Sequence, residues 1–150
     1  FSMNQVSCKC DPNLDQPNHS NAKQTVIDTF SFKDIPEYDI ALIFVSDEFL
    51  SDLKKEYFQK NHFTDVISFR LNEYDKSFVE GEVYISLPRA KENSKIFNEP
   101  YTKEVSRLII HGCLHLIGFK DESKSEKEIM TKSEEEILKI TNWEGLFTDL

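Results

Sequence analysis

The sequence predicts an α+β fold, with a small mixed β-sheet of three to four strands covered by about five helices. Short apolar runs of strand character lie in the first part of the chain, and segments with helical spacing dominate the second part. The 150 residues match the size of one domain, and they contain no internal repeat. We therefore expect a single domain over 1–150, with a buried central helix.

The first third of the chain predicts a polar leading segment, a helix, a strand and a second helix. Residues 1–22 are rich in Asn, Asp, Pro, Ser and Gln, which predicts a loosely ordered lead-in. A short helix is expected over 22–30. The run "DIALIFVS" (39–46) is apolar and β-branched, and predicts a buried strand. Asp47 is a suitable cap for a helix over 47–58.

Two further strands and a helix follow in the middle of the chain. "TDVISFRL" (64–71) and "EGEVYISL" (80–87) have strand composition and are separated by a polar connection. Pro88 suits the first turn of a helix over 88–97, because proline lacks the N–H that such a position leaves unpaired.

The last third predicts two helices. Thr102 is a candidate cap for a helix over 102–118, which ends at Gly118. This helix is apolar nearly all round, which is typical of a buried helix. Ser123 begins a capping-box pattern and predicts a final helix over 123–140.

The net charge of −9 argues against a surface that binds nucleic acid generally. The charge is uneven, because residues 121–150 hold nine acidic residues against four lysines. We expect the acidic C-terminal helix, with Glu134, Glu135 and Glu136, to face away from any functional site. The remaining basic residues either form a local patch or are scattered over a solvated surface: Lys54, Lys55, Lys60, Arg70, Arg89, Lys91 and Lys95.

No apolar run approaches the roughly 18 residues that a membrane span needs, and the start of the sequence lacks a secretion signature. We therefore expect a cytoplasmic protein without a membrane partner. Cys8 and Cys10, with His19 nearby, are one half of a possible zinc site, although a polar leading loop is the favoured interpretation. Cys113 is expected to be a buried, reduced thiol.

The stretch "HGCLHLIGFKD" (111–121) is the strongest candidate for chemistry. His111 and His115 are four residues apart, so both rings lie on one face of the helix and can share a metal ion. Gly118 allows the chain to turn back and bring Asp121 towards the two rings as a third ligand. Alternatively, the two histidines satisfy one another or a backbone carbonyl, but burial, glycine and aspartate together favour the metal site.

The pattern is similar to H-E-x-x-H of zinc peptidases, but Gly112 stands where those enzymes have their general-base glutamate. Glycine cannot accept a proton from water, so a zinc peptidase is disfavoured on mechanism.

Three blocks of the sequence together resemble the YbeY family, bacterial endoribonucleases of ribosomal RNA maturation. "HGCLHLIGFKD" is similar to the family's H-G-x-L-H-L-x-G-[YF]-D-H signature. "FTDVISF" (63–69) resembles its P-T-D-V-L-S-F block, and "EGEVYIS" (80–86) resembles its L-G-D-I-x-I-S strand. The order and spacing agree, so the resemblance covers about residues 40–140.

The chain departs from the family at two positions. The family's third histidine aligns with Asp121, so the implied ligands are two histidines and one aspartate. We expect one divalent ion, Zn²⁺, although an aspartate oxygen makes a harder site in which other ions compete better. Phe58 stands where the family tends to carry an arginine, and either Arg70 or Lys60 is a candidate substitute.

The resemblance implies a metal-dependent, single-strand-specific endoribonuclease that acts near the 3′ end of 16S rRNA in maturation and ribosome quality control. The implied partners are single-stranded rRNA and the small ribosomal subunit with its assembly factors. Glu82 is a candidate acid or base, or else an exposed strand residue. Asp65 is a candidate for orienting a histidine ring, or else makes a local turn bond.

Two alternative functions stay open at this point. One is a ribosome-assembly binding factor whose metal is structural, which Phe58 and the acidic charge favour. The other is a metal-dependent hydrolase of another substrate, such as a peptide, against which Gly112 argues.

Overall fold

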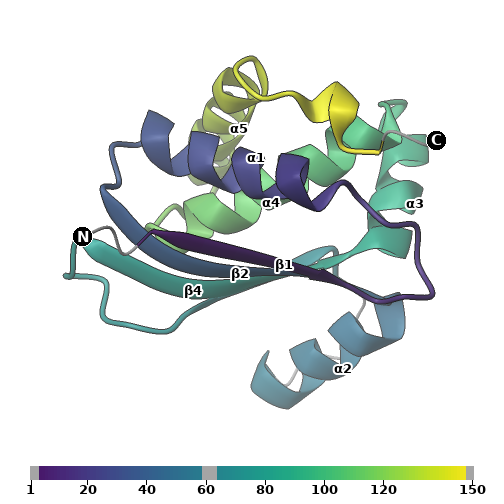
Figure 1. The fold of residues 1–150 in the computed structure, drawn as a ribbon, viewed down its shortest axis with the longest axis horizontal. Coiled ribbons are helices and arrows are strands. Elements are labelled where there is room, and N and C mark those ends of the chain that lie inside the picture. The colour runs from purple at the N-terminus through teal and green to yellow at the C-terminus, as the bar shows by residue number, and fades with distance from the viewer. Residues whose placement is uncertain (1–3, 59–63, 148–150) are drawn as a thin grey trace.

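The computed structural model describes residues 4–58 and 64–147, which form a four-stranded sheet with helices on both faces (Figure 1). The strands are β1 (Gln5–Cys10), β2 (Glu37–Val45), β3 (Val66–Arg70) and β4 (Phe78–Ser86). Their order across the sheet is β1-β2-β4-β3. β1, β2 and β4 are mutually parallel, and β3 pairs with β4 in the antiparallel sense as an edge strand.

The helices divide unequally between the two faces of the sheet. They are α1 (His19–Phe32), α2 (Asp47–Phe58), α3 (Leu87–Phe97), α4 (Tyr101–Leu116), α5 (Lys124–Leu138) and a short 3-10 turn, η1 (Trp143–Gly145). Figure 1 shows α1, α4 and α5 above the sheet and α2 below it. The α+β class and the mixed sheet are thus as predicted, and the elements from α1 to α5 follow one another in the predicted order.

Helix α4 is the centre of the core. It packs on β3 and β4 and also contacts α1, α3 and α5. Leu108, Ile109 and Leu116 on this helix are almost fully buried. Burying one such side chain stabilises the fold by about 1.5–3 kcal/mol. The prediction of a buried central helix that carries the histidines is therefore confirmed.

The expectation of a loosely ordered lead-in over 1–22 was wrong for residues 5–10 and 19–22, which form regular elements. Residues 5–10 form β1, which pairs in parallel with β2. Val6, Cys8 and Cys10 alternate inward and pack against the main core, while the polar residues between them face out. α1 begins earlier than predicted, because the Asn18 side chain accepts the N–H of Asn21 and caps it.

Cys8 and Cys10 are core residues on β1 and do not lie in a polar loop. Burial raises the pKa of Cys8 to about 12 and that of Cys10 to about 11, so both thiols stay protonated at neutral pH. Thiolate is the form that binds metal. Cys113 is fully buried and reduced, as predicted.

The helix starts agree only in part with the predicted caps. Ser123 forms the expected capping box. α4 begins at Tyr101 without a side-chain cap, so Thr102 does not have the predicted role. Asp47 is the first residue of α2 and does not cap it; the hydroxyl of Ser46 accepts the Phe49 N–H instead.

Within the described residues, no helix is both long and apolar enough to cross a membrane.

Gly112 sets how closely α4 approaches the sheet. A Cβ atom at this position would lie 2.5 Å from Cγ1 of Val83 and 3.2 Å from Oγ of Ser68. The Ser68 hydroxyl donates a 2.8 Å hydrogen bond to the Gly112 carbonyl, so strand and helix are also joined by a polar contact. Any side chain here would push α4 away from β3 and β4.

We predict that Gly112→Ala destabilises the protein by about 1–3 kcal/mol, the usual range for an overpacked core. The loss should occur although alanine favours helices by about 1 kcal/mol over glycine. Urea unfolding measures it. In Gly112→Ala/Val83→Ala, where the clashing methyl is removed, the combined loss should be smaller than the sum of the two single losses. Unchanged or higher stability in the single variant would contradict the close approach.

Candidate metal centre

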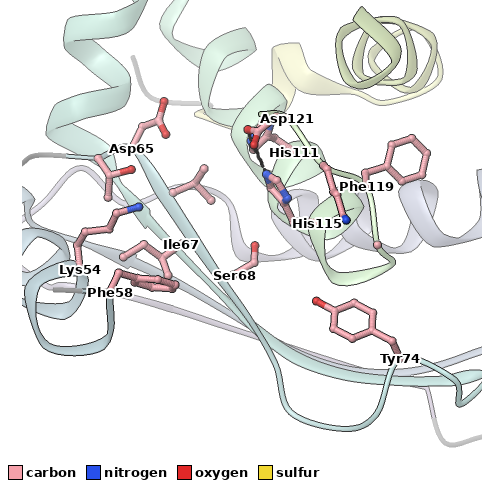
Figure 2. A pocket seen from close by; sticks show the side chains of 14 residues that line it. Lys54, Phe58, Asp65, Ile67, Ser68, Tyr74, His111, His115, Phe119 and Asp121 are labelled. Atoms are coloured by element: carbon pink, nitrogen blue, oxygen red, sulfur yellow. Dashed lines mark hydrogen bonds and ion pairs between the residues drawn. The ribbon is translucent and has the colours of Figure 1, made fainter. Parts of the chain in front are cut away.

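His111 and His115 lie near the C-terminal end of α4, and the turn after the helix brings Asp121 to them. Gly118 has φ 99°, a left-handed conformation that glycine adopts without a steric penalty. The Gly118 N–H donates to the His115 carbonyl, so the chain turns directly at the helix end. Figure 2 shows the Asp121 carboxylate beside both rings. The predicted cluster is therefore assembled by one helix and one turn.

Three side-chain atoms in this cluster form a small triangle. His111 Nε2 lies 3.0 Å from His115 Nε2, and Asp121 Oδ2 lies 3.2 Å from the first and 3.3 Å from the second. Zinc ligands at about 2.0–2.1 Å from a tetrahedral ion are separated by about 3.3 Å. The triangle thus has the size of one face of a tetrahedral coordination shell. Among the described residues, this is the group of His, Cys, Asp and Glu placed to hold an ion.

His111 has a carboxylate on its other ring nitrogen. Glu134 of α5 places Oε2 2.5 Å from His111 Nδ1, and both side chains are largely buried. In the neutral ring this contact keeps the proton on Nδ1, where it is donated to the carboxylate. The lone pair of Nε2 then points into the triangle, as a metal ligand requires.

Arg107 holds the Glu134 carboxylate in place from one turn earlier on α4. Its Nη1 lies 3.2 Å from Glu134 Oε1, and its Nε and Nη2 each lie 2.8 Å from the oxygens of Glu104. Both carboxylates raise the pKa of this largely buried guanidinium, against the opposing effect of burial. Arg107 is therefore a fixed cation beneath the histidines.

The buried network continues to the opposite wall of the site. The Asn93 amide donates to Glu104 over 3.2 Å and to Asp65 over 3.0 Å. The sequence suggested that Asp65 accepts a hydrogen bond from a histidine ring, but in the structure its hydrogen-bond partner is the Asn93 amide. Instead, it is joined to His111 through a chain of side chains, namely Asn93, Glu104, Arg107 and Glu134.

A cavity of about 620 Å³ opens over the triangle, along the free edge of β3. Its charged lining residues balance in number, with Lys54 and Lys120 against Asp65 and Asp121. The net charge of −9 is thus not concentrated at the site. Side chains from α2, β3, the turn after β3 and the end of α4 line the cavity: Lys54, Phe58, Thr64, Asp65, Val66, Ile67, Ser68, Tyr74, His111, His115, Gly118, Phe119, Lys120 and Asp121.

Glu82 lies away from this cavity. Its neighbours on β4, Gly81 and Val83, face Leu116 and Gly112 of α4. Because strand side chains alternate, Glu82 points to the other face, where it accepts a hydrogen bond from Tyr84. The structure therefore does not bring Glu82 together with the histidines.

Arg70, one of the two predicted substitutes for the family's arginine, does not line the cavity. Arg70 donates to the carbonyls of Leu116, Glu73 and Phe78, so its guanidinium ties the end of α4 to the β3–β4 connection. Lys60 lies outside the described residues. Arg89 is paired with Asp47 at 2.6 Å. Of the predicted basic patch, Lys54 is the described member that lines the cavity.

The sequence did not identify Glu134 as the partner of His111. We expected the acidic helix α5 to face away from the site, and this was wrong for Glu134. Glu135 is exposed, whereas Glu134 is 3% exposed. A signal was present, because Glu134 falls on the same helical stripe as Met130, Ile137 and Leu138. A glutamate on the buried stripe of a helix needs a partner.

Comparisons with known proteins relate this chain to one family. A model of the family described as Endoribonuclease YbeY matches residues 5–142. Endoribonuclease YbeY of Christiangramia forsetii is 41% identical over 98 residues, which are 65% of this chain and 67% of the relative. Endoribonuclease YbeY of Bacteroides fragilis is 42% identical over 100 residues, 67% of this chain and 70% of the relative.

A solved structure extends the likeness to most of the chain. The solution structure of TM1509 from Thermotoga maritima aligns with a TM-score of 0.59 and 26% sequence identity, covering 91% of each chain. The likeness in fold therefore extends over nearly the whole length of both chains. Together with the family match over 5–142, this confirms the resemblance of the three sequence blocks: the chain belongs to the YbeY family.

Proposed function

We propose that this protein is a metal-dependent, single-strand-specific endoribonuclease that matures rRNA at the 3′ end of the small-subunit (16S) RNA and serves ribosome quality control. The observation that carries the proposal is the triangle of His111, His115 and Asp121 at an open cavity, in a chain whose relatives are named endoribonucleases. Its partners are single-stranded rRNA and the small ribosomal subunit with its assembly factors, in the cytoplasm.

The residues at the triangle fit a divalent ion, and Zn²⁺ is the ion we propose. Two imidazole nitrogens and one carboxylate oxygen are a zinc ligand set with a fourth position left for substrate or water. When bound, the ion supplies Lewis-acid activation of water and neutralises charge on the phosphoryl group. The single carboxylate makes the site harder than one with three histidines, so Mn²⁺ or similar ions compete better.

The chain's own residues hold and orient this chemistry. Glu134 keeps the proton of His111 on Nδ1, and Arg107 keeps Glu134 from moving. Lys54 and Lys120 on the cavity walls are the cations placed to meet the phosphates of a bound strand. We assign Asp65 a positioning role, because it connects to His111 through the buried network that begins at Asn93.

A structural role for the metal, in an assembly factor that binds without cutting, is the second candidate. One observation favours it: no arginine lines the cavity in the described part of the chain, since Arg70 is occupied by backbone carbonyls. Arginine is the side chain best suited to bidentate phosphate contacts. Cleavage assays separate this candidate from the nuclease.

A peptidase is not supported. Glycine at position 112 has no side chain to accept a proton from water, and a Cβ atom there would lie 2.5 Å from Cγ1 of Val83.

We predict that Glu134→Gln weakens metal binding about 10- to 100-fold, the usual effect of removing a ligand's hydrogen-bonding carboxylate. Titration of the apoprotein with Zn²⁺ against a competing chelator measures the affinity. Glu135→Gln is the matched control, because it removes the same charge from the exposed neighbour and should bind like the wild type. Equal losses in the two variants would assign the effect to overall charge instead of to the His111 contact.

The function itself is tested with a single-stranded rRNA 3′ precursor and metal-loaded protein. We predict that His115→Ala loses metal and lowers the cleavage rate about 100-fold or more, since metal activation contributes several kcal/mol to such reactions. Gel analysis of the products measures the rate, with Glu135→Gln as the active control. Retention of metal with no cleavage by the wild type would favour the assembly factor. Equal cleavage by wild type and His115→Ala would show that the histidine site does not cut RNA.

A further inference from the structure

Two exposed aromatic rings line the cavity on different sides of the histidine cluster. Phe58, at the end of α2, is 44% exposed, and Tyr74, in the connection between β3 and β4, is 62% exposed. Figure 2 shows Phe58 beside Lys54 at one side of the view and Tyr74 at the other, with Ser68 and the histidines between them. Both rings therefore flank the position where a reacting phosphate would meet the metal ligands.

The Phe58 ring is held by other aromatic side chains. It stacks on Phe69 of β3, with ring centroids 6.1 Å apart and planes 24° apart. Phe69 in turn meets Tyr57 and Tyr84 edge-on. This cluster fixes the ring on the sheet before any ligand arrives, which lowers the entropy cost of stacking a ligand on it.

The Tyr74 ring is supported in a different way. The Arg70 guanidinium lies 4.9 Å from its centroid, and that guanidinium is fixed by the carbonyls of Leu116, Glu73 and Phe78. The ring is thus supported by a cation that cannot easily move. A second flat group on the open side of Tyr74 would find a preformed platform.

The cations near these rings identify the ligand class. The Lys54 ammonium lies 5.0 Å from the Phe58 centroid, and Lys120 lines the same cavity. Rings next to cations suit a chain that alternates flat apolar groups with anions, and single-stranded RNA is such a chain. Stacking of a base on an aromatic ring is stronger than an exposed cation–π contact, so a base displaces the Lys54 ammonium towards a phosphate.

We propose that Phe58 and Tyr74 are base-stacking residues that hold the nucleotides on the two sides of the phosphate at the metal triangle. The inference rests on the proposed function and gives the single-strand specificity a physical basis, because bases paired in a duplex cannot stack on protein rings. It also assigns a role to Phe58, which stands where the family resemblance implies an arginine. At this position the Phe58 ring would bind a base, whereas an arginine would bind a phosphate.

The test measures binding of Zn²⁺-loaded protein to a 2′-O-methyl single-stranded RNA oligonucleotide by fluorescence anisotropy. Each nucleotide in turn is replaced by an abasic one. In the wild type, abasic replacement at two positions should weaken binding about 5- to 100-fold each, the usual range for one stacked base. Gel analysis confirms that the oligonucleotide stays intact.

The variants assign each position to a ring. Phe58→Leu and Tyr74→Leu keep an apolar side chain but remove the ring, so each should bind intact RNA more weakly and lose sensitivity at one abasic position only. Phe58→Trp and Tyr74→Phe keep a ring and should keep the wild-type profile. Phe97→Leu is the matched control, because Phe97 is 57% exposed at the end of α3 and does not line the cavity.

Two outcomes overturn the inference, and they are distinct from failure of the proposed function. Wild-type cleavage of RNA with a flat abasic profile would show a nuclease that does not stack bases at these rings. Suppose instead that each leucine variant weakens the binding of intact RNA and of every abasic RNA by the same factor. That result would show that the rings only shape the cavity. A wild type that neither binds the oligonucleotide nor cleaves RNA would overturn the proposed function, and the inference with it.

Discussion

The close contact of α4 with the sheet at Gly112 is the constraint on which the rest of the structure depends. Because α4 lies against Val83 of β4, both its distance from the sheet and its rotation about its own axis are fixed. Because His111 and His115 lie to one side of the sheet-facing stripe, that rotation directs both rings towards the free edge of β3. Gly118 then returns the chain on the same side, and Asp121 completes the triangle. Packing thus decides the geometry of the triangle, and its two histidines are placed by a helix that has little freedom to move.

The buried charges beneath the histidines are costly for the fold. Glu104 and Glu134 are almost fully buried, and taking carboxylates out of water costs several kcal/mol each unless they are paired. Arg107 pairs with both, yet a well-packed apolar set in their place would often be as stable. The network is therefore better explained by the site than by stability. It keeps a carboxylate against His111 Nδ1, which fixes the ring so that its other nitrogen faces the triangle.

Local periodicity explains which parts of the site were predictable. The spacing of His111 and His115, the turn at Gly118 and the acid that follows all lie within eleven residues. The closeness of these side chains could therefore be predicted without knowing how distant segments pack. Glu134 comes from another helix, and its contact depends on how α5 packs against α4. Glu82 was misplaced because its strand was recognised without deciding which face met α4. β1 was missed since a polar edge strand has the composition of a loop, although Val6, Cys8 and Cys10 alternate inward.

The charge of the chain and an RNA substrate are compatible because the charges are segregated. The cavity walls carry two lysines and two aspartates, whose formal charges cancel, so a bound divalent ion would add positive charge there. The acidic excess belongs largely to residues 121–150, and of the three consecutive glutamates on α5 none lines the cavity. Attraction for phosphate is then concentrated at one place, and non-specific binding elsewhere is weak. Among the described residues two lysines line the cavity, so we propose that further affinity comes from contacts that need no charge, and the exposed rings that line the same cavity are suited to supply them.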